Sequence, residues 1–97
     1  ERFMKKIFTD QEIKYCRGRY PQIAARFASK EAVMKALGTG IRGVPWKSIE
    51  VHRARGKAPE ILLHGNAKKK AQELGIERIA LSISHSRNYA VASVVAE

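Results

Sequence analysis

The sequence predicts an α+β domain in which helices pack on one side of a mostly antiparallel sheet. Three observations lead to this fold class: apolar residues recur at helical spacing in the first third, later segments alternate polar and apolar residues, and a lysine-rich helical segment divides the alternating segments into two pairs. The expected order is therefore αααββαββ. With 97 residues, the chain is expected to form one domain, residues 1–97.

The N-terminal segment predicts two short helices. ERFMKKIF places Phe3 and Ile7 on one apolar stripe. The sequence from Thr9 to Glu12 has the form of a capping box, in which both side chains accept hydrogen bonds from free backbone amides at a helix start. A second helix is therefore expected to run from there to about Cys16.

The remaining elements follow from the same kinds of signal. A third helix is expected over residues 21–37, with Gly38 just past its end because glycine takes the left-handed conformation without penalty. Asn66 is the predicted N-cap of a fourth helix that stops at Gly75, with Ala67, Ala71 and Leu74 facing inward. The alternating segments that predict strands are SIEV, EILLH, ERIALSIS and YAVASVVA.

The net charge of the chain indicates which kinds of molecule it binds. Nineteen Lys and Arg against nine Asp and Glu give a net charge of +10, which attracts polyanions such as nucleic acid, acidic lipid, an acidic protein or a phosphate-rich small molecule. RGRYP is a basic turn, and ARGKAPE is a turn between two predicted strands. A small basic domain that binds nucleic acid is the alternative function, although no groove-reading or base-stacking motif is recognisable.

Cysteine usage and hydropathy indicate the compartment. Cys16 is the only cysteine, so no intrachain disulfide can form, which favours a reducing compartment. No apolar run approaches the roughly 18 residues of a membrane span. The sequence therefore predicts a cytoplasmic protein that makes no use of a membrane. Because the chain begins with Glu1 instead of Met, upstream sequence is expected to be missing.

Two charged pairs lie on the third predicted helix. Glu31 and Lys35 are one turn apart on the same side, which by itself is most typical of an ordinary surface ion pair. Arg26 and Lys30 are also one turn apart and carry like charges. Since that arrangement costs stability, it predicts an anion between the two side chains.

Two further segments carry polar groups. Gly38-Thr39-Gly40 follows a helix instead of preceding one, so on spacing alone it is a helix stop and loop, not a phosphate loop. SISHS places hydroxyl groups and the His85 imidazole at a strand end, where they could surround an oxyanion or phosphate. A Ser-His hydrolase is disfavoured because no acidic residue lies nearby in sequence. Structural roles are expected for His52 and His64, and Trp46 is expected to pack on the core.

Together these segments resemble a known family. RFASKEAVMKALGTGI, WKSIEV, GKAP with ILLHG, and LSISHSRNYAVASVV are similar, in this order, to the holo-acyl-carrier-protein synthases, the short class of 4′-phosphopantetheinyl transferases. The resemblance covers nearly the whole chain, from about Arg2 to Val95. The combination of FASKEA with SISH is its most specific part.

The resemblance implies an enzyme of fatty acid and lipid biosynthesis. Its reaction would be the Mg²⁺-dependent transfer of phosphopantetheine from coenzyme A to a serine of apo acyl carrier protein, with release of adenosine 3′,5′-bisphosphate. Magnesium commonly joins one or two carboxylates to substrate phosphates, so it suits this chemistry. The resemblance also implies a homotrimer with active sites between subunits.

The resemblance also implies residue roles. Glu31 corresponds to a metal ligand, and Lys35 to the lysine that meets the coenzyme A pyrophosphate. Arg2 and Lys6 match basic positions of the helix on which the carrier protein docks. The residues expected to bind coenzyme A are Arg26, Lys35, Gly38, Thr39, Gly40, Ser84 and His85.

One family element has no counterpart. Family members begin with a strand of the type GIGTDIVEI, whose aspartate is a second metal ligand, and nothing similar precedes Glu1. The chain is therefore expected to be N-terminally incomplete, and without that aspartate its activity as given is uncertain.

Overall fold

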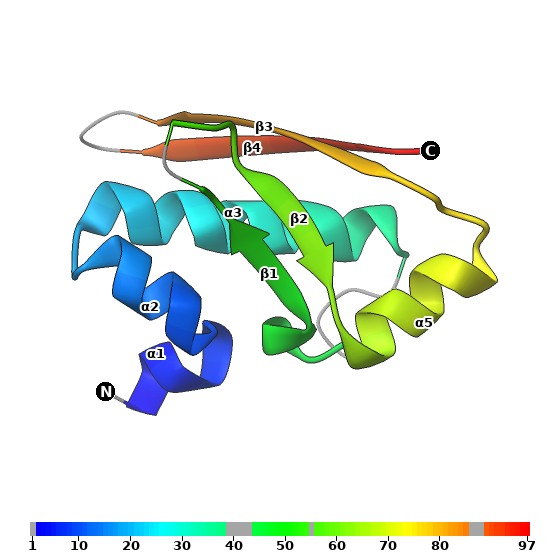
Figure 1. Cartoon of the computed structure of the whole chain (residues 1–97), viewed down its shortest axis with the longest axis horizontal. Coiled ribbons are helices and arrows are strands. Elements are labelled where there is room, and N and C mark those ends of the chain that lie inside the picture. Colours follow the sequence, from blue (N-terminus) through cyan, green and yellow to red (C-terminus); the bar gives the residue numbers. More distant parts are fainter. Residues whose placement is uncertain (1, 39–43, 55, 86–88) are drawn as a thin grey trace.

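The structure is a computed structural model, which describes residues 2–38, 44–54, 56–85 and 89–97 and the backbone but not the side chain of His85. Helices and strands follow the predicted order, with one added 3₁₀ turn, η1 (Figure 1). The bounds are α1 Arg2–Ile7, α2 Asp10–Cys16, α3 Tyr20–Ala36, η1 Trp46–Ser48, β1 Ile49–His52, β2 Glu60–Leu63, α5 Gly65–Glu73, β3 Ile79–His85 and β4 Ala90–Ala96.

The strands form two antiparallel hairpins. β1 pairs with β2, and β3 pairs with β4, each as a two-stranded sheet. The long helix α3 packs on both β3–β4 and β1, so it lies at the centre of the molecule (Figure 1). The α+β class and the order of elements are confirmed. The described strands divide into two small antiparallel sheets, and β2 lies beside β3 without a hydrogen-bonded ladder.

Local signals place most helix ends correctly. The predicted capping box is present: Thr9 Oγ1 accepts from the Glu12 amide, and Glu12 Oε1 accepts from the Thr9 amide at 2.9 Å. The α3 helix carries Pro21 in its first turn and is followed by Gly38 at φ +72°. These helix ends are therefore determined by residues that lie within a few positions of each end.

The core lies where α3, β1 and α5 meet. Its buried members are Val33, Met34, Leu37, Val44, Ile49, Ala67 and Ala71. Trp46 packs against this cluster and stacks on Phe27, with ring centroids 5.0 Å apart, as expected for a core tryptophan. Among the described residues, every helix is too short or too polar to span a bilayer.

Three predicted details of the helices are wrong. The α5 helix begins at Gly65, with His64 at the N-cap, so Asn66 lies inside the helix and does not cap it. Leu74 is 49% exposed because it follows the last turn, where the chain leaves the core, whereas Ala67 and Ala71 face inward as predicted. On α1, Phe3 is 57% exposed and does not share the buried position of Ile7.

The predicted anion between Arg26 and Lys30 is also wrong, because Lys30 is used elsewhere. Its ammonium lies 2.8 Å from Glu12 Oε1, with both side chains fully buried. It also donates to the backbone carbonyls of Trp46, at 3.1 Å, and Ile49. The buried pair ties α3 to α2 and to the start of β1, and three hydrogen bonds satisfy the ammonium.

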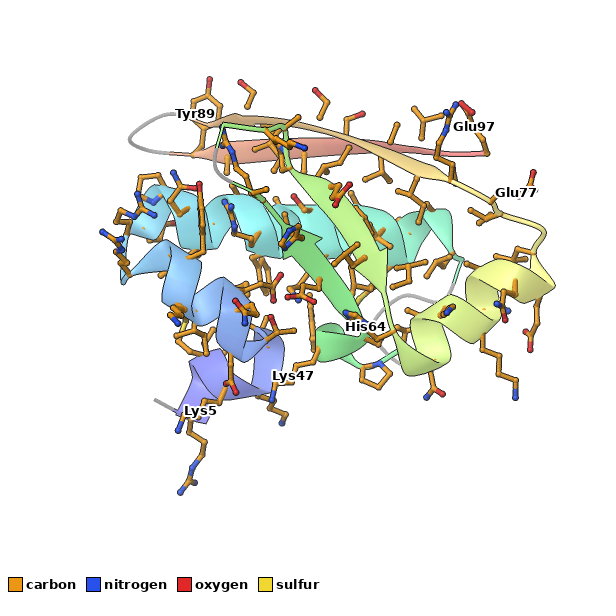
Figure 2. All side chains as sticks on the ribbon, viewed as in Figure 1. Lys5, Lys47, His64, Glu77, Tyr89 and Glu97 are labelled. Carbon is orange, nitrogen blue, oxygen red and sulfur yellow. The ribbon has the colours of Figure 1, made fainter. Side chains whose placement is uncertain are left out.

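Histidine and cysteine take structural positions. His64 lies at the junction of β2 and α5 (Figure 2), and its Nε2 is 2.8 Å from Glu50 Oε1. Cys16 is buried, and this burial raises the pKa of its thiol, an effect that nearby Arg26 partly opposes. The position of His64 agrees with the structural role expected for this residue.

Candidate active site

The exposed side of α3 borders an aromatic hollow. Glu31 projects from the helix at the edge of this hollow, whose volume is about 440 Å³. The carboxylate is exposed, so it is available to a ligand. The aromatic side chains that line the hollow are Phe3, Phe8, Tyr20, Phe27 and Tyr89.

Lys35 follows Glu31 by one turn and is also exposed. Gly38 ends this ridge, and its amide donates to the carbonyl of Lys35 at 3.0 Å. The left-handed backbone at Gly38 turns the chain away from the helix. Thr39 and Gly40 lie outside the described residues.

The end of the β3–β4 hairpin reaches the same hollow. Ala90 lines the hollow with Glu31, and in the ladder it pairs with His85. The fold therefore brings the SISH segment to α3, although the two are far apart in sequence. Ser84 pairs with Val91, and both are exposed on the face of the hairpin that points away from α3. One chain thus presents Glu31 and Ser84 on different faces.

Arg26 differs from the other described residues that were predicted to bind coenzyme A, because its side chain is buried and the residue is 2% exposed. Its Nη1 donates to Gln22 Oε1 at 2.7 Å, and its guanidinium lies 4.4 Å from the centroid of the Tyr15 ring. Among the described residues, Arg26 Nε has no hydrogen-bond partner. This burial does not favour direct contact between Arg26 and a ligand at Glu31.

The predicted docking residues lie on α1. Arg2 and Lys6 are one turn apart on this helix, and both are exposed. They are therefore free to meet an acidic partner, and the neighbouring Phe3 contributes to the hollow beside Glu31.

Comparisons with known proteins identify the family of this chain. The chain matches the family described as the 4′-phosphopantetheinyl transferase superfamily over residues 1–94. It belongs to that superfamily. The holo-[acyl-carrier-protein] synthase of Koribacter versatilis is 50% identical over 101 residues, covering 100% of this chain and 81% of the relative. That of Chlamydia caviae is 52% identical over 99 residues, covering 98% and 78%.

Solved structures of the same superfamily share the fold. The Helicobacter pylori holo-[acyl-carrier-protein] synthase in complex with coenzyme A superimposes with a TM-score of 0.87 at 33% identity, covering 99% of this chain and 82% of that one. The Neisseria meningitidis enzyme gives 0.86 at 37% identity, with 100% and 81% covered. The predicted fold class and the predicted family are thereby confirmed.

Among the described residues that line the hollow, Glu31 is the one that carries a carboxylate. Within the part of the chain that the structure describes, no three His, Cys, Asp or Glu side chains gather into a metal site. The exposed Glu31 fits Mg²⁺ as one of its ligands, because Mg²⁺ is commonly held by one or two carboxylates together with substrate phosphates. The donor set therefore suits a metal that arrives with a phosphate substrate.

The sequence did not indicate that exposed aromatic residues surround this hollow. Phe3, Tyr20 and Tyr89 are 57%, 65% and 62% exposed and surround the hollow beside Glu31. They come from α1, from the start of α3 and from the residue before β4, so no spacing in the sequence connects them. A weak signal was present, since both tyrosines adjoin predicted turns instead of apolar stripes.

Proposed function

We propose that this protein transfers the 4′-phosphopantetheine group of coenzyme A to a serine of apo acyl carrier protein. The observation that carries the proposal is that relatives named for this activity match almost the full chain. In support, Glu31 is exposed beside a hollow that is also lined by Ala90, the ladder partner of His85. The products would be holo acyl carrier protein and adenosine 3′,5′-bisphosphate. This reaction would supply fatty acid biosynthesis.

Glu31 and Lys35 would act on the reacting diphosphate. Glu31 would hold Mg²⁺, which when bound neutralises charge on the pyrophosphate and holds it for attack. The Lys35 ammonium would bind the same pyrophosphate and stabilise charge on the leaving side. Phosphoryl transfer needs mainly positioning and charge neutralisation, and exposed neighbours on one helical ridge can provide both.

The rest of coenzyme A would lie beyond this ridge. Gly38, Thr39 and Gly40 would let the ligand approach backbone closely, because glycine has no side chain. Ser84 and His85 would bind the nucleotide end. The family resemblance assigns Arg26 to the same end, although in this chain Arg26 is buried and contacts Gln22 and Tyr15.

We further propose that the active unit is a homotrimer. Glu31 and Ser84 lie on different faces of one chain, so one coenzyme A molecule can meet both only if a second copy supplies one of them. Each copy would be one domain, residues 1–97. The exposed Val91 and Val95 on the outer face of the hairpin would be covered by that contact.

The partner and compartment follow from the charges and the substrates. The exposed Arg2 and Lys6 on α1 would attract an acidic carrier protein and speed its encounter. A cytoplasmic location is proposed because both substrates would be met there and because Cys16 has no cysteine partner. Nucleic acid and membrane have no role in this proposal.

The proposal is tested by Glu31→Gln. Purified protein, apo carrier protein, coenzyme A and Mg²⁺ are combined, and the phosphopantetheine mass gain of the carrier is followed by mass spectrometry. We expect Glu31→Gln to lower the rate at least about 100-fold through loss of metal-dependent stabilisation, about 2.7 kcal/mol of activation free energy. Its melting temperature should remain within a few degrees of wild type because the side chain is exposed.

Glu73→Gln on α5 is the matched control, since it removes the same charge from another exposed helical position. It should retain nearly the full rate. If both variants lose activity equally, or if wild-type protein with Mg²⁺ never modifies the carrier, the proposed role of Glu31 fails.

A further inference from the structure

The buried ammonium of Lys30 lies against the junction between α1 and α2. Its Nζ is 5.5 Å from the centroid of the ring of Phe8, the residue that follows α1 and precedes the Thr9 cap. The same Nζ lies 2.8 Å from Glu12 Oε1, which accepts from the Thr9 amide at 2.9 Å. One side chain of α3 therefore contacts the first linking residue directly and holds the second through Glu12.

These contacts are shielded from water. Lys30 is 0% exposed, and Phe8 and Glu12 are each 1% exposed. An ammonium has three N–H donors, and that of Lys30 meets Glu12 and the carbonyls of Trp46 and Ile49. Because these acceptors come from α2, η1 and the start of β1, three elements together fix the position of the charge.

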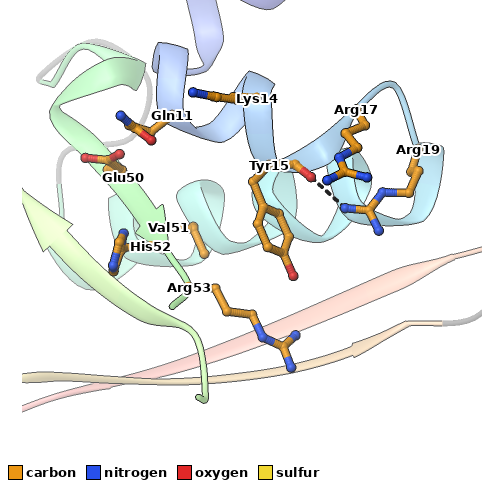
Figure 3. A pocket seen from close by; sticks show the side chains of 9 residues that line it. All are labelled: Gln11, Lys14, Tyr15, Arg17, Arg19, Glu50, Val51, His52 and Arg53. Carbon is orange, nitrogen blue, oxygen red and sulfur yellow. Dashed lines mark hydrogen bonds between the residues drawn. The ribbon is translucent and has the colours of Figure 1, made fainter. Parts of the chain in front are cut away.

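Glu12 extends the same constraint to β1. Its Oε2 accepts from the Val51 amide at 2.8 Å, and Figure 3 shows Val51 on the strand that runs beside α2. Thr9 Oγ1 donates to Glu50 Oε2 on this strand at 3.1 Å. The start of α2 is therefore bound to both β1 and α3, which fixes the point from which α1 leaves the core.

The proposed docking helix α1 has few contacts of its own. It is six residues long, and Ile7 is its one buried residue. It packs mainly on α2 and η1, at one end of the molecule (Figure 1). Because a helix this short is not stable alone, its position relative to α3 depends on the junction that Lys30 contacts.

Lys30 also directly precedes Glu31, the proposed metal ligand. Lys30 points into the core, whereas Glu31 is exposed and lines the aromatic hollow. Phe8 lines that hollow as well, together with Phe3 from α1. Neighbouring residues of α3 thus do two things: one supplies the carboxylate, and the other holds the segment through which α1 reaches the same hollow.

We propose that Lys30 is a positioning residue for the carrier protein, because it holds the docking helix α1 in place relative to Glu31. This role rests on the proposed function. Lys30 would touch neither coenzyme A nor the carrier, and it would act through Phe8 and Glu12. A misplacement of about 1 Å can lower the rate of a reaction about 100-fold, so a small shift of α1 would move the carrier serine out of reach of the diphosphate.

The test uses Glu12→Gln combined with Lys30→Met, because this double variant buries no charge at the junction. Transfer to apo carrier protein is measured at a temperature at which circular dichroism shows every variant to be folded. We expect kcat to fall at least about tenfold, while the Kd for coenzyme A, measured by calorimetry, changes less than about twofold. Glu12→Asp, which keeps both charges but shortens the carboxylate side chain, is a second variant that should lower kcat in the same way.

Ala67→Gly on α5 is the control, since it lowers stability at a buried helical position outside the α1–α2 junction. It should retain nearly the full kcat. A second readout needs no activity: spin labels at Lys5→Cys on α1 and Ala36→Cys on α3, both exposed positions, report the distance between the helices. With Cys16→Ala in all samples, the double variant should broaden this distance distribution.

An unchanged kcat in the folded double variant, or an equal loss in the Ala67→Gly control, would overturn the positioning role. So would a distance distribution as narrow as that of the protein that keeps Glu12 and Lys30. Wild-type protein that never modifies the carrier would refute the proposed function, and the carrier role of Lys30 with it, even if the labels showed that Lys30 restrains α1.

Discussion

The buried pair between Lys30 and Glu12 makes a strong prediction about stability. Lys30→Met keeps most of the side-chain volume but removes the ammonium, so the Glu12 carboxylate stays buried without a counter-charge. Glu12 would retain two backbone donors, the amides of Thr9 and Val51, at 2.9 and 2.8 Å. The carbonyls of Trp46 and Ile49 would lose the donor that Lys30 supplies.

Breaking a buried pair from one side costs about 3–5 kcal/mol. A domain of this size has about 5–15 kcal/mol of total stability, so Lys30→Met should remove at least about a fifth of it. Adding Glu12→Gln to Lys30→Met should recover about 1–3 kcal/mol, because the double variant buries no charge. The losses of stability caused by the two substitutions are therefore expected to be strongly non-additive.

Urea unfolding followed by circular dichroism measures these losses, at one protein concentration for all variants because association adds to stability. A loss below about 1 kcal/mol for Lys30→Met, the range of an exposed pair, would refute the reasoning. A double variant whose loss equals the sum of the two single losses would refute it as well.

The contribution of Lys30 to stability should change with pH in a defined direction. Burial lowers the pKa of Lys30, and Glu12 partly opposes this effect. Between the lowered native pKa and the ordinary value near 10.5, the unfolded chain binds more protons, so the contribution of Lys30 to stability rises with pH. The gap in stability between wild type and Lys30→Met should therefore widen at alkaline pH.

Two more predictions concern α2. Thr9→Ala removes the helix cap and the hydrogen bond to Glu50, so it should lower the free energy of unfolding by about 1–2 kcal/mol and the melting temperature by several degrees. Thr9→Ser should restore most of this loss. A serine variant as unstable as the alanine variant would contradict the capping role. Cys16 is 1% exposed, and burial raises the pKa of its thiol, so at pH 8 it should react with a disulfide reagent far more slowly in native protein than in urea. Equal native and unfolded rates, followed by absorbance, would show that Cys16 is accessible.

Much of the fold could be predicted because the relevant signals are local. The capping box at Thr9 and Glu12 and the stop at Gly38 each act within a few residues, and all are confirmed. The predicted cap at Asn66 failed because the strand that precedes α5 ends at Leu63 and brings His64 into the capping position. Boundaries near a strand depend on the pairing of that strand, which no local pattern reports.

The candidate site was only partly predictable. Glu31 and Lys35 are one turn apart on one helix, so their spacing in the sequence predicts that both side chains lie on the same side of that helix. The approach of Ala90 and the His85 backbone to Glu31 requires the β3–β4 hairpin to pack on α3, a contact between segments more than fifty residues apart. The proposed roles of Thr39, Gly40 and the His85 side chain remain predictions from the family resemblance.

By itself, the sequence determined the types and order of the elements, the cap of α2, the end of α3, the family and the positive charge, because each of these depends on residue identity and short spacing. The tertiary structure alone decided which charges are buried and which meet. Glu12 and Lys30 became a dry ion pair, while Glu31 stayed exposed beside the aromatic hollow. The strength of a Coulomb interaction depends on the distance between the charges and on the exclusion of water. Both are determined only when the chain is packed into its tertiary structure.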